Sequence, residues 1–129
     1  MIFMFYTEGL IVMTTNSSIT LFHKRYNNQT KIDEWDRYTI QNTMWQGGKG
    51  ASVNKGYERA NDVSIWMPYI ENENLDTIPF AIGDIVVKGT ITTDITKQSD
   101  LKVDNYNIMT LINNNYGSYN MQHIHIGAK

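Results

Sequence analysis

The stretch WDRYTIQNTMW (residues 35–45) carries the pattern that decides the fold. Its residues alternate between two sides: one side holds Trp35, Arg37, Thr39, Gln41, Thr43 and Trp45, and the other holds Asp36, Tyr38, Ile40, Asn42 and Met44. A period of two, with many aromatic and β-branched residues, is typical of a β-strand. We therefore predict a strand from about Arg37 to Trp45.

The same period recurs along the chain, with turn residues about every ten positions. Further strands are predicted in SITLFHKRY (18–26), DVSIWMPY (62–69), IGDIVVKG (82–89), YNIMTLINN (106–114) and MQHIHIGA (121–128). One short helix of about two turns is predicted in ITKQSDLKVDNY (95–106), with Thr96 or Ser99 as its N-cap. This pattern favours a mainly β fold, a small antiparallel β-barrel or sandwich with one short helix.

The length of 129 residues, with 41% hydrophobic and 19% charged residues, predicts a single globular domain over residues 14–129. The opening MIFMFYTEGLIVM (1–13) is apolar but has no Lys or Arg and is interrupted by Glu8. It lacks the features of a signal peptide and is shorter than a membrane span. We expect an N-terminal extension, which is either disordered and upstream of a natural start at Met13, or an ordered arm or extra strand.

The net charge and the cysteine content limit the classes of function that the chain can have. The net charge is −2, so no broad basic face is expected and sequence-specific nucleic-acid binding is disfavoured. The eight Tyr keep open a small barrel that stacks single-stranded bases. The absence of cysteine excludes a disulfide framework, a thiolate zinc site and a cysteine nucleophile.

The spacing of His123 and His125 raises the question of a metal site. On a strand the two residues share a face and lie about 6.6 Å apart. Zinc needs a third protein ligand, and no spacing brings His23 or Asp84 near. In the histidine-triad nucleotide hydrolases a third histidine follows, whereas this chain has Gly127 there. We predict no metal or cofactor. A metal-dependent or nucleotide-processing enzyme using these histidines remains the alternative.

Two polar loops are the candidates for contacts with subunits or partners. GGKGAS (47–52) lacks the order of a phosphate-binding loop, because Lys49 is followed by Gly50 and no helix follows. The acids Glu71 and Glu73 lie in an Asn-rich loop without an apolar pocket to raise a pKa. Within loops 47–56 and 71–79, both able to order on assembly, the candidate contacts are Gly47, Gly48, Lys49, Gly50, Lys55, Glu71, Asn72, Glu73 and Asn74.

From about Thr15 onward the chain resembles an uncharacterised family of small proteins encoded in the structural gene cluster of tailed phages and prophages of low-GC Gram-positive bacteria. The segments that carry the resemblance are TLFHKR, WDRYTIQNTMW, GAS…KGYERANDVSIWMP, FAIGDIVVKG and LKVDNYNIMTLINNNYGSYNMQHIHIGAK. In that family an aromatic and an acid more often follow the first terminal histidine, where this chain has Ile124 and His125. This difference disfavours a ligand role for His125.

The order of features is also similar to that of the head-closure proteins of long-tailed phages, which are small β-barrels. The shared features are a Gly-Asp turn, a short strand ending in glycine, an intervening segment and a last strand that begins with histidine. The resemblance implies a non-enzymatic minor capsid or head–tail connector protein in the virion neck, made in the host cytoplasm. Its expected partners are portal, adaptor and tail proteins and copies of itself in a ring, with no membrane.

Overall fold

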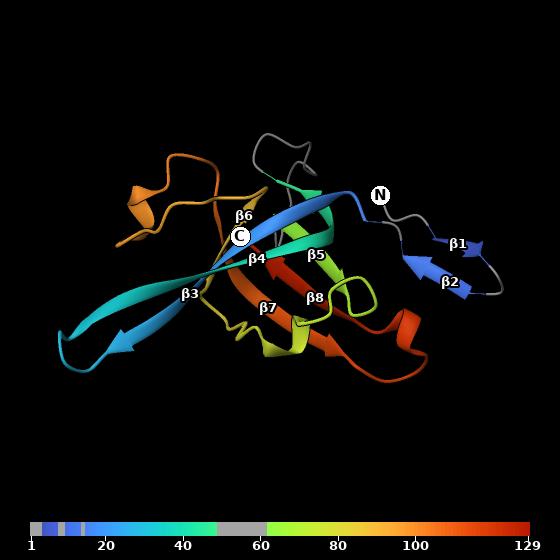
Figure 1. The fold of residues 1–129 in the computed structure, drawn as a ribbon. Helices are drawn as coiled ribbons and strands as arrows, with labels where there is room; N and C mark the ends of the chain where they lie inside the picture. The colour runs from blue at the N-terminus through green and yellow to red at the C-terminus, as the bar shows by residue number, and fades with distance from the viewer. Residues whose placement is uncertain (1–3, 8–9, 14, 49–61) are drawn as a thin grey trace, which may run out of the picture.

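The computed structural model describes residues 4–7, 10–13, 15–48 and 62–129. The fold is mainly β, and six antiparallel strands pair in the order β3-β4-β5-β8-β7-β6, with β6 pairing back onto β3 to close a small barrel (Figure 1). The six strands are β3 Ser17–Asn27, β4 Ile32–Gly47, β5 Val63–Pro68, β6 Ile85–Lys88, β7 Tyr106–Asn114 and β8 His123–Ala128.

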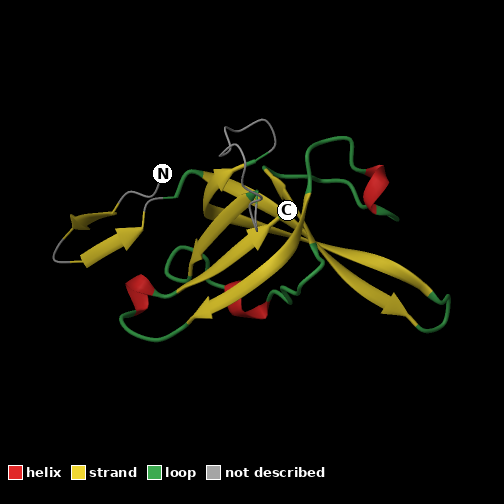
Figure 2. Ribbon diagram, turned by 180° about the vertical axis from the view of Figure 1, so that it is seen from behind, coloured by secondary structure: helices red, strands yellow, loops and turns green. Residues whose placement is uncertain are grey.

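Two further strands, β1 Met4–Thr7 and β2 Leu10–Met13, pair with each other in a separate antiparallel hairpin. This hairpin lies beside η3 (Tyr119–Met121), at the end of the molecule away from the tip of the β3–β4 hairpin (Figures 1 and 2). Part of the opening segment is thus built as strands outside the barrel. No helix in the described ranges is both long and apolar enough to cross a membrane.

The six barrel strands occupy the segments predicted as strands. The main difference is β4, which begins at Ile32, five residues earlier than expected. Its alternation also changes phase, because the register with β3 shifts between the pairs Ser17–Thr43 and Ile19–Ile40. Consequently Ile40 and Trp45, predicted to lie on opposite sides, belong to the same core cluster.

The helix predicted in residues 95–106 is only a single 3₁₀ turn, η2 (Gln98–Asp100), and its N-cap is Lys97 rather than Thr96 or Ser99. The Asp100 carboxylate accepts hydrogen bonds from the amides of Thr96 and Lys97, at 2.9 and 3.2 Å, and thereby closes the turn. The chain is extended again at the next residue. Another 3₁₀ turn, η1 (Leu75–Thr77), lies in the loop after β5.

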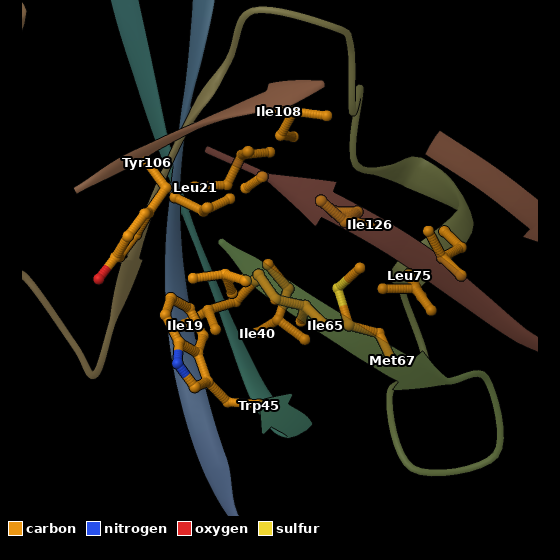
Figure 3. Close-up of a cluster of buried hydrophobic side chains, with 14 residues drawn as sticks. Ile19, Leu21, Ile40, Trp45, Ile65, Met67, Leu75, Tyr106, Ile108 and Ile126 are labelled. Carbon is orange, nitrogen blue, oxygen red and sulfur yellow. The ribbon is translucent and has the colours of Figure 1, made fainter. Parts of the chain in front are cut away.

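The barrel interior is filled by side chains from every ring strand (Figure 3). Its buried members are Ile19, Leu21, Ile40, Trp45, Val63, Ile65, Met67, Leu75, Val86, Tyr106, Ile108, Ile124, Ile126 and Ala128. A second cluster of Phe22, Ile85, Val87 and Ile95 lies beside β3 and β6, with Trp35, Ile91 and Leu101 packed against it. The segment around η2 therefore covers the outside of these two strands, which explains why Ile85–Val87 is buried without alternation.

Candidate functional site

The hairpin of β3 and β4 extends well beyond the barrel (Figures 1 and 2). β6 pairs with β3 only at Ile19–Phe22, and β5 pairs with β4 only at Met44–Gly47. Residues 23–36, called the arm below, are therefore paired only with each other among the described strands. An isolated two-stranded hairpin is at best marginally stable in water, so other contacts must hold the arm.

Local hydrogen bonds shape the tip of the arm. The Asn27 side-chain oxygen accepts from the amides of Gln29 and Thr30 at 2.9 and 3.2 Å. Lys31 has a positive φ of 59°, and its amide donates to the Asn27 carbonyl at 2.7 Å. Beside this turn Tyr26 is 56% exposed and Ile32 is 59% exposed. The tip thus offers two large apolar side chains to solvent.

Ion pairs connect the two strands of the arm. Lys24 lies 3.4 Å from Asp33, and Arg25 lies 3.1 Å from Glu34 and 3.0 Å from Asp36. The hydrogen bond from Arg25 lowers the pKa of Asp36, so this carboxylate is charged at neutral pH. These side chains are largely exposed, so solvent screens each pair and its contribution to stability is small.

At the base of the arm, on the β3 side, a buried carboxylate binds the strand edge with which a neighbouring strand would otherwise pair. Asp84 is 1% exposed, and its Oδ1 accepts from the Lys24 amide at 3.1 Å. Its Oδ2 accepts from Nδ1 of His23 at 2.8 Å and from the Ala81 amide at 3.0 Å. The predicted turn at Gly83–Asp84 therefore also anchors β3 at the point where its pairing with β6 ends.

On the β4 side, the side-chain amide of Asn72 binds the backbone of the strand in a similar way. The Asn72 Nδ2 donates to the carbonyls of Asn42 and Pro68, each at 2.9 Å. The Asn72 Oδ1 accepts from the Asn42 amide at 3.3 Å. Asn72 thus satisfies both backbone groups of Asn42 as a paired strand would. Between this point and Ile32, no described strand pairs with the free edge of β4.

Two clefts follow this free edge. The first has a volume of about 530 Å³ and lies between residues 32–38 of β4 and residues 94–96. Arg37 supports its wall through a 3.0 Å ion pair with Asp94 and a 3.2 Å hydrogen bond to the Ile91 carbonyl. The second cleft, of about 320 Å³, lies between residues 39–42 and the loop that contains η1.

The predicted contact residues in loop 71–79 line the second cleft. Glu71, Glu73 and Asn74 are exposed there, whereas Asn72 is half-buried and uses its side chain inside the molecule. Only the first three are open to a partner. The loop is held to β4, because the Asn42 side-chain amide also donates to the Glu71 carbonyl at 2.9 Å.

The structure describes only some of the predicted contact residues in loop 47–56. Lys49, Gly50 and Lys55 lie outside the described residues. Gly47 and Gly48 end β4 with positive φ angles of 93° and 128°. A Cβ at Gly47 would overlap the carbonyl oxygen of Asp62, so glycine is required there by the junction between β4 and β5.

The terminal histidines share a face of β8 but are engaged differently. The Nδ1 of His123 donates to the Met121 carbonyl at 3.0 Å and its Nε2 accepts from Asn114 at 3.0 Å, so neither ring nitrogen is left for a metal. His125 stacks on Trp66 with ring centroids 4.5 Å apart, and its buried Nε2 has no hydrogen-bond partner. Burial, and then the charge of His123, lowers the pKa of His125.

The described ranges contain no group of three or more His, Asp or Glu side chains that could hold a metal ion. The third histidine, His23, is bound to Asp84 at the base of the arm.

Sequence reasoning missed the arm because the predicted segments, 18–26 and about 37–45, are shorter than β3 and β4, which have 11 and 16 residues. The barrel pairs only four residues of each strand with its other neighbour. A hairpin of such length must leave part of itself outside a small barrel. The Gly and Asn content that marks the two candidate loops does not indicate whether a segment projects from the barrel.

The comparisons with known proteins give one match. A family model described as a family of unknown function, DUF6751, matches residues 13–129, which include the whole barrel, the arm and both clefts. Searches of curated proteins and of solved structures each found no match.

Proposed function

The chain belongs to the DUF6751 family, and from that premise we propose that it is a non-enzymatic structural protein of a bacteriophage virion. In this role it is a minor capsid or head–tail connector component, similar to a head-closure protein, that joins the portal complex to the tail. The sequence segments that resemble small proteins of phage structural gene clusters support the proposal. They include FAIGDIVVKG, which contains the Asp84 anchor.

The observation that carries the proposal is the arm. Closing a sheet into a barrel removes most free strand edges, so contacts between copies favour an element that projects from it. The arm supplies one, because residues 23–36 stand outside the barrel with both outer edges free of described strands. A projecting element that contacts a different surface of the next copy makes a head-to-tail contact, and such contacts close into rings when the rotation permits.

The charges of the chain fit this role. The net charge is −2, and the arm has as many Asp and Glu as Lys and Arg side chains, several of them joined in ion pairs, so it presents no basic face. A ring that surrounds a DNA channel then leaves the phosphates without neutralising contacts, and DNA passes without being held. The proposed partners are accordingly portal, adaptor and tail proteins and further copies of this chain, at the virion neck after synthesis in the bacterial cytoplasm.

The test is assembly with the neighbouring gene products. The full chain is co-expressed with the portal, adaptor and tail proteins encoded beside its gene, and complexes are measured by light scattering after size exclusion and by electron microscopy. We expect a monomer or weak oligomer alone and a ring on the partner complex. The double variant Tyr26→Asp with Ile32→Asp, which charges the exposed tip, is expected to lose the ring.

A matched control places the same charges elsewhere. Tyr116 is 75% exposed and Ile82 is 61% exposed, and neither belongs to the arm. The double variant Tyr116→Asp with Ile82→Asp should assemble as the original chain does. Failure of the original chain to associate with any of these partners, or equal assembly by both double variants, would refute the proposed role of the arm.

A further inference from the structure

The backbone of β4 along the first cleft presents hydrogen-bonding groups away from β3. The Lys24 amide points to Asp84 and not to its cross-strand partner Trp35. In an antiparallel ladder such a pair is a non-hydrogen-bonded one, and hydrogen-bonded and non-hydrogen-bonded pairs alternate. The amide and carbonyl groups that point outward from β4 by this alternation belong to Asp33, Trp35, Arg37 and Thr39.

These outward groups form an open edge that is long enough to pair with one more strand. From Asp33 to Thr39 the strand covers about 20 Å at about 3.3 Å per residue. No described strand pairs with this edge, which ends at Asn42 because Asn72 occupies the next position. The first cleft opens along the same residues, so it has room for one more strand.

The two faces beside the edge differ in chemistry. Glu34 and Asp36 lie on one face and share a single cation, Arg25. The charged side chains that line the cleft are four carboxylates and two guanidinium groups, and Lys24 beside the lining pairs with Asp33, which leaves one negative charge in excess. The other face carries Trp35, which packs in the same cluster as Ile95 and lies between Asp33 and Arg37, whose charges are paired with Lys24 and Asp94. An incoming strand would therefore meet acidic groups on one face and an indole ring flanked by ion-paired side chains on the other.

We propose that the first cleft binds an extended segment of a partner protein. The segment adds as an antiparallel strand to β4 and alternates Lys or Arg with apolar residues. Main-chain hydrogen bonds to the open edge hold the segment, as in other cases of strand addition. Its basic side chains pair with Glu34 and Asp36, and its apolar side chains pack beside Trp35. The inference rests on the proposed function only in taking the arm region as a contact surface.

The geometry predicts which amides of the bound segment are used. Side chains of directly opposed residues lie on the same face of a sheet, so apolar residues of the segment oppose Asp33, Trp35 and Arg37. These β4 residues point their backbone groups outward, so the amides of the apolar residues donate to β4 and those of the basic residues point away. The competing explanation is that the charges of the arm only guard a free edge against aggregation.

The experiment uses the full chain and the blocked peptide Lys-Val-Lys-Val-Lys-Val-Lys, with binding measured by fluorescence anisotropy and by amide shifts in nuclear magnetic resonance. We expect saturable binding with shifts centred on Asp33, Trp35 and Arg37. N-methylation of the three valines should weaken binding at least tenfold, whereas N-methylation of the inner lysines should leave it within about twofold. The peptide with Glu in place of Lys should not bind.

Protein variants test the acidic face. Glu34→Gln with Asp36→Asn should weaken binding at least tenfold, and the control Glu73→Gln with Asp104→Asn, which removes two exposed charges elsewhere, should not. Equal affinity for the two N-methylated peptides, shifts that map outside β4, or no saturable binding at millimolar peptide would overturn the proposal. Because this assay contains none of the proposed portal, adaptor or tail partners, its failure leaves the assembly experiment unaffected.

Discussion

Replacement of Asp84 by alanine should destabilise the protein more than any exposed charge substitution. The buried carboxylate accepts hydrogen bonds from the Lys24 and Ala81 amides and from His23. Alanine removes all three hydrogen bonds and leaves a space in which no protein group replaces the acceptor oxygens. The base of the arm then loses its connection to the turn before β6.

The magnitude follows from the number and kind of hydrogen bonds that the substitution removes. A hydrogen bond to a charged group contributes about 1.5–3 kcal/mol net, and a donor left without a partner costs about 1–3 kcal/mol more when water cannot reach it. Lys24 and Ala81 are not fully buried, so part of this loss is recovered by hydration. We expect a decrease of about 3 kcal/mol in the free energy of unfolding. With an unfolding entropy of about 2.1 cal/mol/K per residue, this corresponds to a Tm lower by about 11 °C.

The assay is thermal and urea unfolding followed by circular dichroism. Asp84→Asn keeps one acceptor oxygen and should lose about half as much free energy. Asp104→Ala removes an exposed carboxylate and should change the free energy of unfolding by less than about 0.5 kcal/mol. If Asp84→Ala were as stable as Asp104→Ala, the Asp84 carboxylate would not be an anchor of the arm.

Three further predictions concern other parts of the barrel. Asn72→Ala should lower the free energy of unfolding by about 2 kcal/mol because it leaves buried backbone groups unpaired, whereas Asn74→Ala, which removes no side-chain cap, should change it by less than about 0.5 kcal/mol in urea titrations. Burial lowers the folded-state pKa of His125 below its usual 6.5, so the unfolded chain takes up the proton first and Tm should fall as pH drops through the range just below 6.5; a His125→Phe variant that keeps the same slope would contradict this. Gly47→Ala should be less stable than Gly89→Ala by about 1 kcal/mol or more in thermal melts, because both have similar positive φ angles but only Gly47 lacks space for a Cβ; equal stabilities would disprove the clash.

Much of the fold was predictable because alternation along a strand is a local property. The strand predicted in DVSIWMPY (62–69) is an example: its alternate residues Val63, Ile65 and Met67 are all buried. The phase change in β4 was not predictable, since it results from a register shift against β3. The helix expected in residues 95–106 does not form, for a related reason. Ile95 and Leu101 both cover the outside of β3 and β6, which favours an extended path.

The candidate site was harder to predict than the fold. Asn72 was chosen as a contact residue from its polar surroundings, but its side chain is bound to the backbone of β4. Asp84 was considered as a turn residue and as a possible third metal ligand, but not as the residue that binds the arm. Both roles depend on segments that lie 30 and 60 positions away in the chain, which a local pattern does not reveal.

The anchors Asp84 and Asn72 make the outer hairpin an exchangeable part. Trp35 is the last arm residue that packs against the second cluster, and among the described residues the part of the hairpin beyond it is joined to the rest of the protein by its two strands, so its reach can evolve without repacking the interior. Adding two residues to each strand lengthens it by about 7 Å and keeps every side chain on its original face, whereas adding one reverses them. A grafted hairpin of another length should therefore leave the thermal stability of the body nearly unchanged, provided that the insertion comes in even steps.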